Sequence, residues 1–244
     1  MTVKIRPAIP PLPAEKVGKK IDFIAKSLAV TLEEHGFVRK GRTLYCLVGE
    51  GSARCWQIVN LQADKWNEGS EGSFFVNLSL QFPAVIALRS QLALFKWEAE
   101  WAEQPNEAAG QTRKRFDFSY RKGRFLSFVM PGIFSRDSVK ISVETDLQDL
   151  AQQFGAAIVE RALPWFSAHN NLIALRDSKG LQYMQSPFDR VGAAILLGDC
   201  IAGNNVVEEH IDFFIRFPPE RLVELRRWLV QNGLNDSVLA PAEG

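Results

Sequence analysis

The sequence predicts an α+β protein with a mainly antiparallel sheet of about five strands, helices packed on one face of the sheet and a helical C-terminal extension. Short stretches rich in β-branched and aromatic residues recur through residues 42–145. After them, apolar residues recur at three- and four-residue steps, which is the spacing of a helix face. With 244 residues, 46% of them hydrophobic, the chain can bury a sizeable core.

Composition divides the chain into three parts. Residues 1–13 are rich in proline, which fixes φ and favours extended neighbours, so this segment is predicted to be an extended arm. Residues 14–165 contain the strand patterns and are predicted to form the α+β core domain. Residues 166–244 contain mainly helical patterns, and we expect this helical extension to pack on the core.

The first elements follow directly after the arm. A helix is predicted there from an apolar stripe at helical spacing, made by Val17, Ile21, Ile24, Leu28 and Leu32. Gly36 suits the left-handed residue that ends a helix. Residues 42–48 and 55–61 flank the turn "GEGSAR" and predict a hairpin, and residues 73–82 predict a third strand.

The later elements alternate between helix and strand. We expect a helix over residues 84–104, a basic and aromatic hairpin within residues 113–129 and a closing strand near residues 137–145. Thr145 and Gln148 have the spacing of a capping box and predict the start of a long helix. The extension predicts helices near residues 170–178, 188–203 and 219–231, with a single short strand-like run at 211–217.

Side chains alternate along a strand, so each predicted strand can be divided into two faces. The apolar face is uniform and consists of Leu44, Cys46, Val48, Cys55, Val59, Leu61, Phe74, Val76, Leu78, Leu80 and Phe82. The mixed face combines aromatic, amide and hydroxyl side chains, namely Thr43, Tyr45, Trp56, Asn60, Gln62, Phe75, Asn77, Ser79 and Gln81. The apolar face predicts a core that packs under helices.

The mixed face is the candidate site. Apolar rings can bind a ligand or a peptide while a few polar groups orient it, which predicts a binding role for Arg42, Tyr45, Trp56, Asn60, Gln62, Phe75 and Asn77. Alternatively, the C-terminal helices cover this face and its amides are simply satisfied by hydrogen bonds. On either hypothesis, we expect Asn60 and Asn77 to lie near one another on one face, at least half buried.

Two other functions compete with the binding of a protein partner or a small ligand. An enzyme could use Arg42, Asn60, Gln62 and Asn77 as a polar pocket, but the chain has no nucleophile elbow, dinucleotide loop or P-loop. An RNA-binding module could use the basic and aromatic residues of 113–129. The formal net charge of +1 argues against nucleic acid as the partner. We therefore expect a non-catalytic binding protein.

Cofactor, metal and membrane segments are not indicated. No apolar run approaches the ~20 residues of a membrane span, and the N-terminal stretch lacks the apolar core of a signal peptide, so we expect a cytoplasmic protein. Cys46, Cys55 and Cys200 lack C-x-x-C spacing and are predicted to be core thiols of a reducing compartment. The histidines have no partner at metal-ligand spacing.

Three ordered motifs resemble a known family. After an amphipathic helix come "GFVRKGRTLY", "VNLQ" and "FFVN", an order similar to that of the bacterial domain of unknown function catalogued under number 4304, over residues 16–165. Ser79 stands where the family pattern has glycine, and the later Cys/Arg-bearing segment has no counterpart around "WEAEWAEQP". The resemblance implies no known activity or substrate. It implies an uncharacterised soluble protein with a partner-binding, immunity-like role.

Overall fold

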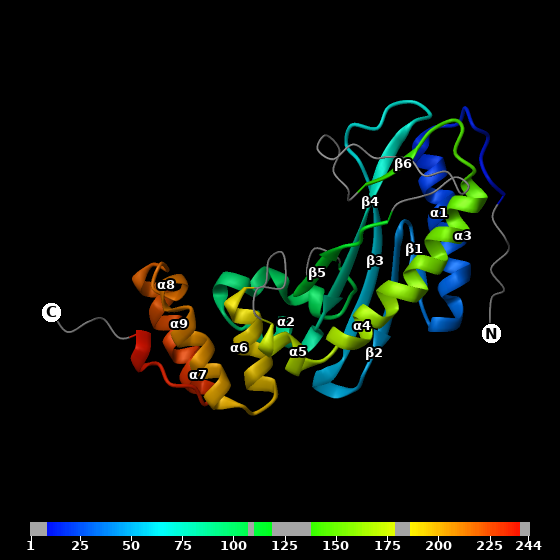
Figure 1. The fold of residues 1–244 in the computed structure, drawn as a ribbon. Coiled ribbons are helices and arrows are strands. Elements are labelled where there is room, and N and C mark those ends of the chain that lie inside the picture. Colours follow the sequence, from blue (N-terminus) through cyan, green and yellow to red (C-terminus); the bar gives the residue numbers. More distant parts are fainter. Residues whose placement is uncertain (1–8, 107–109, 119–137, 179–185, 240–244) are drawn as a thin grey trace. The chain divides into compact units, whose positions relative to one another are not determined.

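Figure 1 shows a computed structural model of the chain, which describes residues 9–106, 110–118, 138–178 and 186–239. It has the predicted α+β fold, with an antiparallel sheet and a helical C-terminal region. The first eight residues of the predicted arm lie outside the described ranges. The predicted boundary after residue 165 stays a prediction.

The described strands form one sheet in the order β1-β2-β3-β4-β5, and β6 pairs with β4. Strand β1 pairs with β2 so that Lys40 lies opposite Thr43, and β6 pairs with β4 so that Ser138 lies opposite Phe75. The strands are β1 Val38–Lys40, β2 Thr43–Val48, β3 Cys55–Ala63, β4 Gly72–Gln81, β5 Thr112–Arg115 and β6 Ser138–Ile141.

The described residues also form α-helices, 3₁₀ helices and a π-helical segment. The α-helices are α1 Val17–Leu32, α2 Pro83–Arg89, α3 Leu147–Ala157, α4 Leu163–His169, α5 Leu172–Asp177, α6 Pro187–Leu196, α7 Cys200–Glu209, α8 Ile211–Phe214 and α9 Pro219–Gln231. The 3₁₀ helices are η1 Glu33–His35, η2 Gly51–Ala53, η3 Ala93–Ala102 and η6 Ser237–Leu239, and η5 Ile158–Ala162 is π-helical.

The chain folds as two units. Unit 1 contains α1, α3 and most of the sheet, and consists of Met1–Leu47, Gln57–Ser79 and Lys114–Ser167. Unit 2 contains α2, η3 and the helices from α5 onward, and consists of Val48–Trp56, Leu80–Arg113 and Ala168–Gly244.

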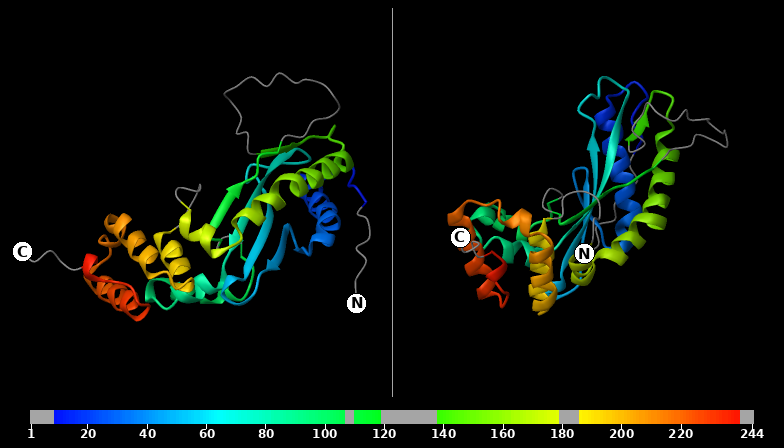
Figure 2. Two further views of the ribbon diagram at one scale, coloured as in Figure 1. Left: turned by 60° about the horizontal axis from the view of Figure 1, so that its bottom comes forward. Right: turned by 60° about the vertical axis from the view of Figure 1, so that its left-hand side comes forward.

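The core of unit 1 lies between the apolar face of the sheet and helices α1 and α3, which pack against each other (Figure 2). Phe74, Val76 and Leu78 on β4 are at most 1% exposed. The Phe74 ring lies 6.1 Å from the ring of Phe154 on α3. The predicted apolar stripe of α1 is also buried, with Ile21 among its fully buried members. The apolar face and this stripe therefore form a core, as the alternation predicts.

Lys20 is a basic residue on the otherwise apolar, buried side of α1, and it is only 1% exposed. Its Nζ donates to the carbonyl oxygens of Ser70 at 2.8 Å and Ser142 at 3.3 Å. Burial lowers the pKa of Lys20, while the nearby Glu71 carboxylate acts in the opposite direction. One acceptor precedes β4 and the other follows β6, so a single side chain ties two loops to α1.

Helices α3 and α4 join through η5 into one continuous helix. The Leu163 N–H donates to the carbonyl oxygen of Ile158, five residues earlier, which is the bond of a π-turn. Pro164 follows at once, yet the helix continues to His169 because the proline comes directly after this widened turn. The buried side of the long helix consists of Phe154, Ile158, Ala162 and Phe166.

Unit 2 has a separate aromatic core around Phe188 on α6. The Phe188 ring lies 4.9 Å from the ring of Phe95 and 5.1 Å from that of Phe214. Trp228 on α9 donates its indole N–H to the carbonyl oxygen of Leu88 on α2 at 3.3 Å. Helices far apart in sequence thus share one buried cluster.

Several predicted boundaries differ from the structure. The helix predicted over 188–203 is two helices, because Gly198 adopts a left-handed φ of 69° and the Asp199 carboxylate then caps α7. The strand-like run at 211–217 begins as helix α8 instead. The cap of α3 is Asp146 rather than Thr145, whose hydroxyl accepts the N–H of Ser142. Most of the predicted hairpin lies outside the described residues.

We predict that Lys20→Met destabilises the protein by about 1–3 kcal/mol, because the part-buried carbonyl oxygens of Ser70 and Ser142 lose their donor. Urea unfolding followed by circular dichroism measures the change. Lys19→Met is the matched control, since the Lys19 side chain is 65% exposed. The control should change stability by less than about 0.5 kcal/mol, and equal effects of both substitutions would contradict the tie between α1 and the loops.

Candidate functional site

In unit 1, the amides of the mixed face make two separate side-chain hydrogen bonds. Asn60 Nδ2 donates to Thr43 Oγ1 at 2.9 Å, which links β3 to β2. Asn77 Nδ2 donates to Gln62 Oε1 at 3.0 Å, which links β4 to β3. Because Asn60 and Gln62 lie on the same side of β3, Asn60 and Asn77 share one face, and both are more than half buried, as predicted. Their partners are Thr43 and Gln62 rather than each other.

Asn60 retains an unused acceptor. Its Oδ1 is buried and receives no hydrogen bond from the described residues, although its Nδ2 is bonded to Thr43. An unsatisfied buried carbonyl oxygen costs roughly 1–3 kcal/mol. Such a cost is typical of a position that receives a donor from a bound molecule or from water.

In unit 1 the mixed face of β3 and β4 is exposed only around Gln62, because Ile58 and Ser79 on the same side of the strands are buried. Helices α1 and α3 lie together on one side of the strands (Figure 2), and the contact of Phe154 with Phe74 shows that this is the apolar side. Gln62 is exposed accordingly, and the neighbouring amides are partly exposed. The exposed part of the mixed face on these two strands therefore lies around Gln62 and its neighbouring amides.

Gln81, in unit 2, shows the opposite arrangement and is fully buried. Its Nε2 donates to the carbonyl oxygens of Trp101 and Gln104, and its Oε1 accepts the N–H of Asn106 at 2.7 Å. The alternative of covered and satisfied amides therefore describes Gln81. The segment that bonds it is the end of η3 and the residues after it, rather than the C-terminal helices.

Arg42 contacts α1 instead of the amides. Its Nε donates to Asp22 Oδ1 at 2.6 Å, and its second terminal nitrogen donates to the carbonyl oxygen of Gly18 at 2.9 Å. Arg42 precedes Thr43 directly, so alternation directs the two side chains to opposite sides. The structure therefore does not bring Arg42 together with Asn60, Gln62 and Asn77.

Aromatic residues of the mixed face differ in their surroundings. The guanidinium carbon of Arg115 on β5 lies 4.2 Å from the centre of the Phe75 ring. Tyr45 lies opposite Val38 of β1 and is partly buried. Trp56 is also partly buried, and it belongs to unit 2. The sequence does not predict Arg115 as a member of this face, because β5 has the sequence TRKR and no apolar alternation.

All charged residues of the described strands are basic. None of β1 to β6 contains Asp or Glu, whereas β1, β5 and β6 contain Arg39, Lys40, Arg113, Lys114, Arg115 and Lys140. Lys40 lies opposite Thr43, which places it on the mixed face. Lys40 and Arg115 thus belong to strands on either side of the amide pairs in the order of the sheet.

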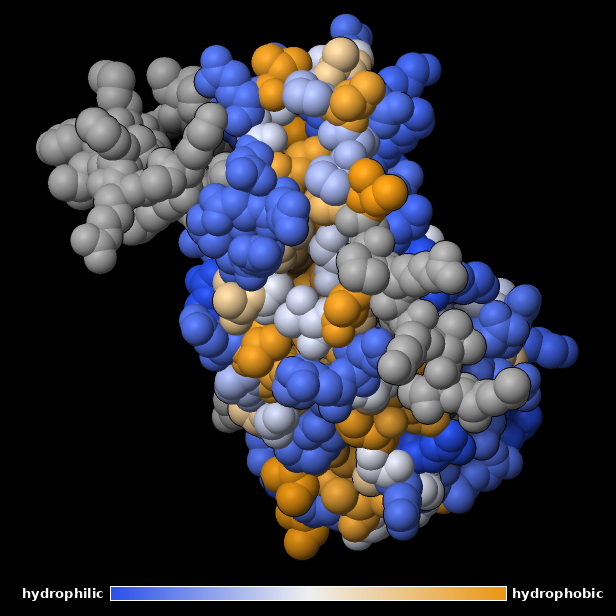
Figure 3. Space-filling model, turned by 90° about the vertical axis from the view of Figure 1, so that its right-hand side faces the viewer, coloured by the Kyte–Doolittle hydropathy of each residue, from blue (hydrophilic) through white to orange (hydrophobic). Residues whose placement is uncertain are grey.

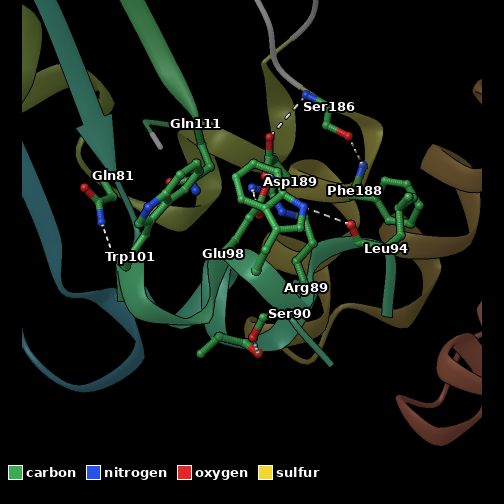
Figure 4. A network of polar contacts seen from close by, with 12 residues as sticks. Gln81, Arg89, Ser90, Leu94, Glu98, Trp101, Gln111, Ser186, Phe188 and Asp189 are labelled. Atoms are coloured by element: carbon green, nitrogen blue, oxygen red, sulfur yellow. Dashed lines mark hydrogen bonds and ion pairs between the residues drawn. The ribbon is translucent and has the colours of Figure 1, made fainter. Parts of the chain in front are cut away.

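A second polar cluster, absent from the sequence predictions, is buried in unit 2 (Figure 4). The Arg89 guanidinium donates to Asp189 Oδ1 at 2.6 Å and to the Glu98 carboxylate. Asp189 Oδ2 also accepts the N–H of Ser186, which completes the capping box of α6. Arg89 therefore joins α2, η3 and α6, and the residues reach one another only through the tertiary fold.

Burial raises the pKa of Asp189 to about 6, while Arg89 acts in the opposite direction. The neighbouring Glu98 carboxylate also raises this pKa, and the Arg113 guanidinium acts in the opposite direction. The small aromatic cavity of unit 2 is lined by other residues, including Leu92, and not by this cluster. Its contacts fit a structural role.

A groove of about 180 Å³ runs between α1 and α3 on the helical side of unit 1. It is lined by Phe23, Ser27, Val30, Thr31, Gln148, Ala151 and Gln152. Figure 3 views the side of the molecule that contains α1, where apolar and polar side chains are interspersed. This lining has no ionisable side chain, so it offers shape and amides but no acid or base.

The described strands contain no His, Asp or Glu, and their two cysteines lie on the apolar face. Burial raises the pKa of the Cys46 and Cys55 thiols, which disfavours a thiolate nucleophile. Cys200 is exposed, in contrast to the predicted core position. Across the described ranges, no group of three or more His, Cys, Asp or Glu side chains is placed to hold a metal ion. None of the described helices is long and apolar enough to cross a membrane.

The structure is that of an α+β protein whose sheet has one core face and one partly exposed face that contains amides. The chain belongs to a family described as a domain of unknown function, DUF4304, whose family model matches residues 28–168, more than half of the chain. The resemblance seen in the three motifs is thereby confirmed. Comparison with curated proteins found no match, and comparison with solved structures found none either.

We predict that Asn60 couples energetically to Thr43 and not to Asn77. In a double-mutant cycle, Asn60→Ala and Thr43→Val should show a coupling of about 0.5–1 kcal/mol, because each removes the same hydrogen bond. Asn60→Ala with Asn77→Ala is the control pair and should be additive within about 0.5 kcal/mol. Urea unfolding of the five variants and the parent measures the coupling energies of both pairs. A larger coupling in the control pair would refute the two-pair arrangement.

Asp189 should impose its own pH dependence on stability. Its folded pKa of about 6 lies above the ordinary value of 3.8. The native state therefore binds the proton more tightly, and this contribution to stability falls as pH rises from about 4 to about 6. The stability difference between the parent and Asp189→Asn should shrink over that window in urea titrations. The exposed Asp212→Asn is the control, and an unchanged difference for Asp189→Asn would contradict the assignment.

Proposed function

We propose that this protein is a non-catalytic binding protein that engages a protein partner or a small ligand through the unit 1 part of its mixed face. The observation that carries the proposal is the row of amides on a partly exposed sheet face, where the buried Asn60 Oδ1 receives no donor from the described residues. Carboxamides offer both donors and acceptors, so they can bind the polar groups of a partner without any chemical step.

Electrostatics supports binding more than catalysis. The described strands contain no carboxylate that could act as a general base, and Arg42, the cation of the enzyme hypothesis, is engaged by Asp22 and Gly18. General acid–base catalysis needs a positioned proton donor or acceptor at the substrate. The face instead provides hydrogen-bonding amides and a ring covered by Arg115.

Selection of random peptides by phage display on the intact chain tests this proposal. We expect enriched peptides whose affinity falls at least about tenfold in the variant Gln62→Ala/Asn77→Ala, measured by fluorescence anisotropy; this corresponds to about 1.4 kcal/mol of binding free energy. Gln152→Ala, in the groove between α1 and α3, is the control and should leave affinity unchanged. Failure to enrich any peptide, or loss of binding only in Gln152→Ala, would overturn the proposal.

A further inference from the structure

We infer that the partner segment bound by the mixed face is an acidic polypeptide in extended conformation; this inference rests on the proposed function. Its basis is a row of side chains that crosses the sheet in unit 1. Lys40 lies opposite Thr43, Thr43 accepts from Asn60, and Asn77 on the next strand donates to Gln62. The row ends at Phe75 and Arg115.

The charge of this row selects for an anionic partner. Lys40 and Arg115 are exposed cations at its two ends, and the described strands contain no carboxylate. Asp64, in the loop after β3, accepts hydrogen bonds from Ser73 Oγ and the Trp66 N–H, so it is engaged within its own turn. Asp117 is the exposed acid that follows Arg115 in the chain. A partner with carboxylates at both ends would complement the two cations.

The geometry favours a polypeptide over a nucleic acid. The middle of the row consists of carboxamides, which have the same donor and acceptor groups as peptide bonds. Neighbouring strands are roughly 4.8 Å apart, so β1 and β5 are separated by roughly 19 Å along the sheet. An extended segment of about six residues spans that length at about 3.3 Å per residue.

The aromatic residues of the mixed face also favour a polypeptide over a nucleic acid. Single-stranded nucleic acids bind through open aromatic rings on which bases stack. The Phe75 ring has the Arg115 guanidinium 4.2 Å from its centre, so one side of this ring is already covered. The formal net charge of the chain is +1, which gives no general attraction for a phosphate backbone.

The test compares fluorescently labelled peptides of equal length, alternating Glu-Thr and alternating Lys-Thr, together with single-stranded oligouridine. We expect only the Glu-Thr peptide to bind, more tightly at low salt because exposed charges are screened. The variant Lys40→Gln/Arg115→Gln should weaken this binding at least about tenfold. Lys19→Gln/Lys26→Gln removes two exposed cations from α1 instead and should leave affinity within about twofold.

The outcomes separate this inference from the proposed function. Binding of the Glu-Thr peptide that is lost in Lys40→Gln/Arg115→Gln and retained in the α1 control supports it. Tighter binding of oligouridine, or equal loss in both variants, overturns it. If the display-selected peptides bind the mixed face but are neutral or basic and the Glu-Thr peptide does not bind, the acidic partner is refuted while the proposed function stands.

Discussion

The burial of one face of β4 against α3 is the constraint on which unit 1 depends. Phe74, Val76 and Leu78 are removed from water, and each buried side chain of this size contributes roughly 1.5–3 kcal/mol relative to its exposed state. A shift of register by one residue would bring Asn77 into the core in their place. The apolar packing therefore also fixes the polar face, because the two sets of side chains alternate on the same backbone.

Polar side chains of this protein differ in their burial and in their hydrogen-bond partners. Lys20 and Gln81 are buried and bonded to backbone carbonyls, so they hold loops in place. Arg89 is buried between two carboxylates and joins helices of unit 2. The amides of the mixed face are bonded only in part. Among the described residues, Asn60 Oδ1 and Arg89 Nε are both buried without a hydrogen-bond partner, and of the two only Asn60 lies on the mixed face of the sheet.

Sequence alone predicts those parts of the molecule that follow from periodicity. Alternation predicts both faces of β3 and β4, and helical spacing predicts the buried stripe of α1. The sequence does not decide between neighbouring residues of similar chemistry. At Thr145 and Asp146, for example, either residue could cap α3. The sequence also does not predict contacts between segments that are distant in the chain. The cluster around Arg89 and the pairing of Arg42 with α1 depend on tertiary packing that no local pattern encodes.

The π-turn before Pro164 decides which way the end of the long helix faces. In an α-helix, steps of four residues rotate by about 40° each, so a stripe with that spacing drifts around the axis. The wider turn of η5 offsets this drift, and Phe154 and Phe166 are both fully buried. Phe166 thereby reaches Phe37, with ring centres 6.2 Å apart. Deleting one residue from η5 would rotate everything after it by about 100° and turn Phe166 away from Phe37, so the length of this helix is fixed residue by residue.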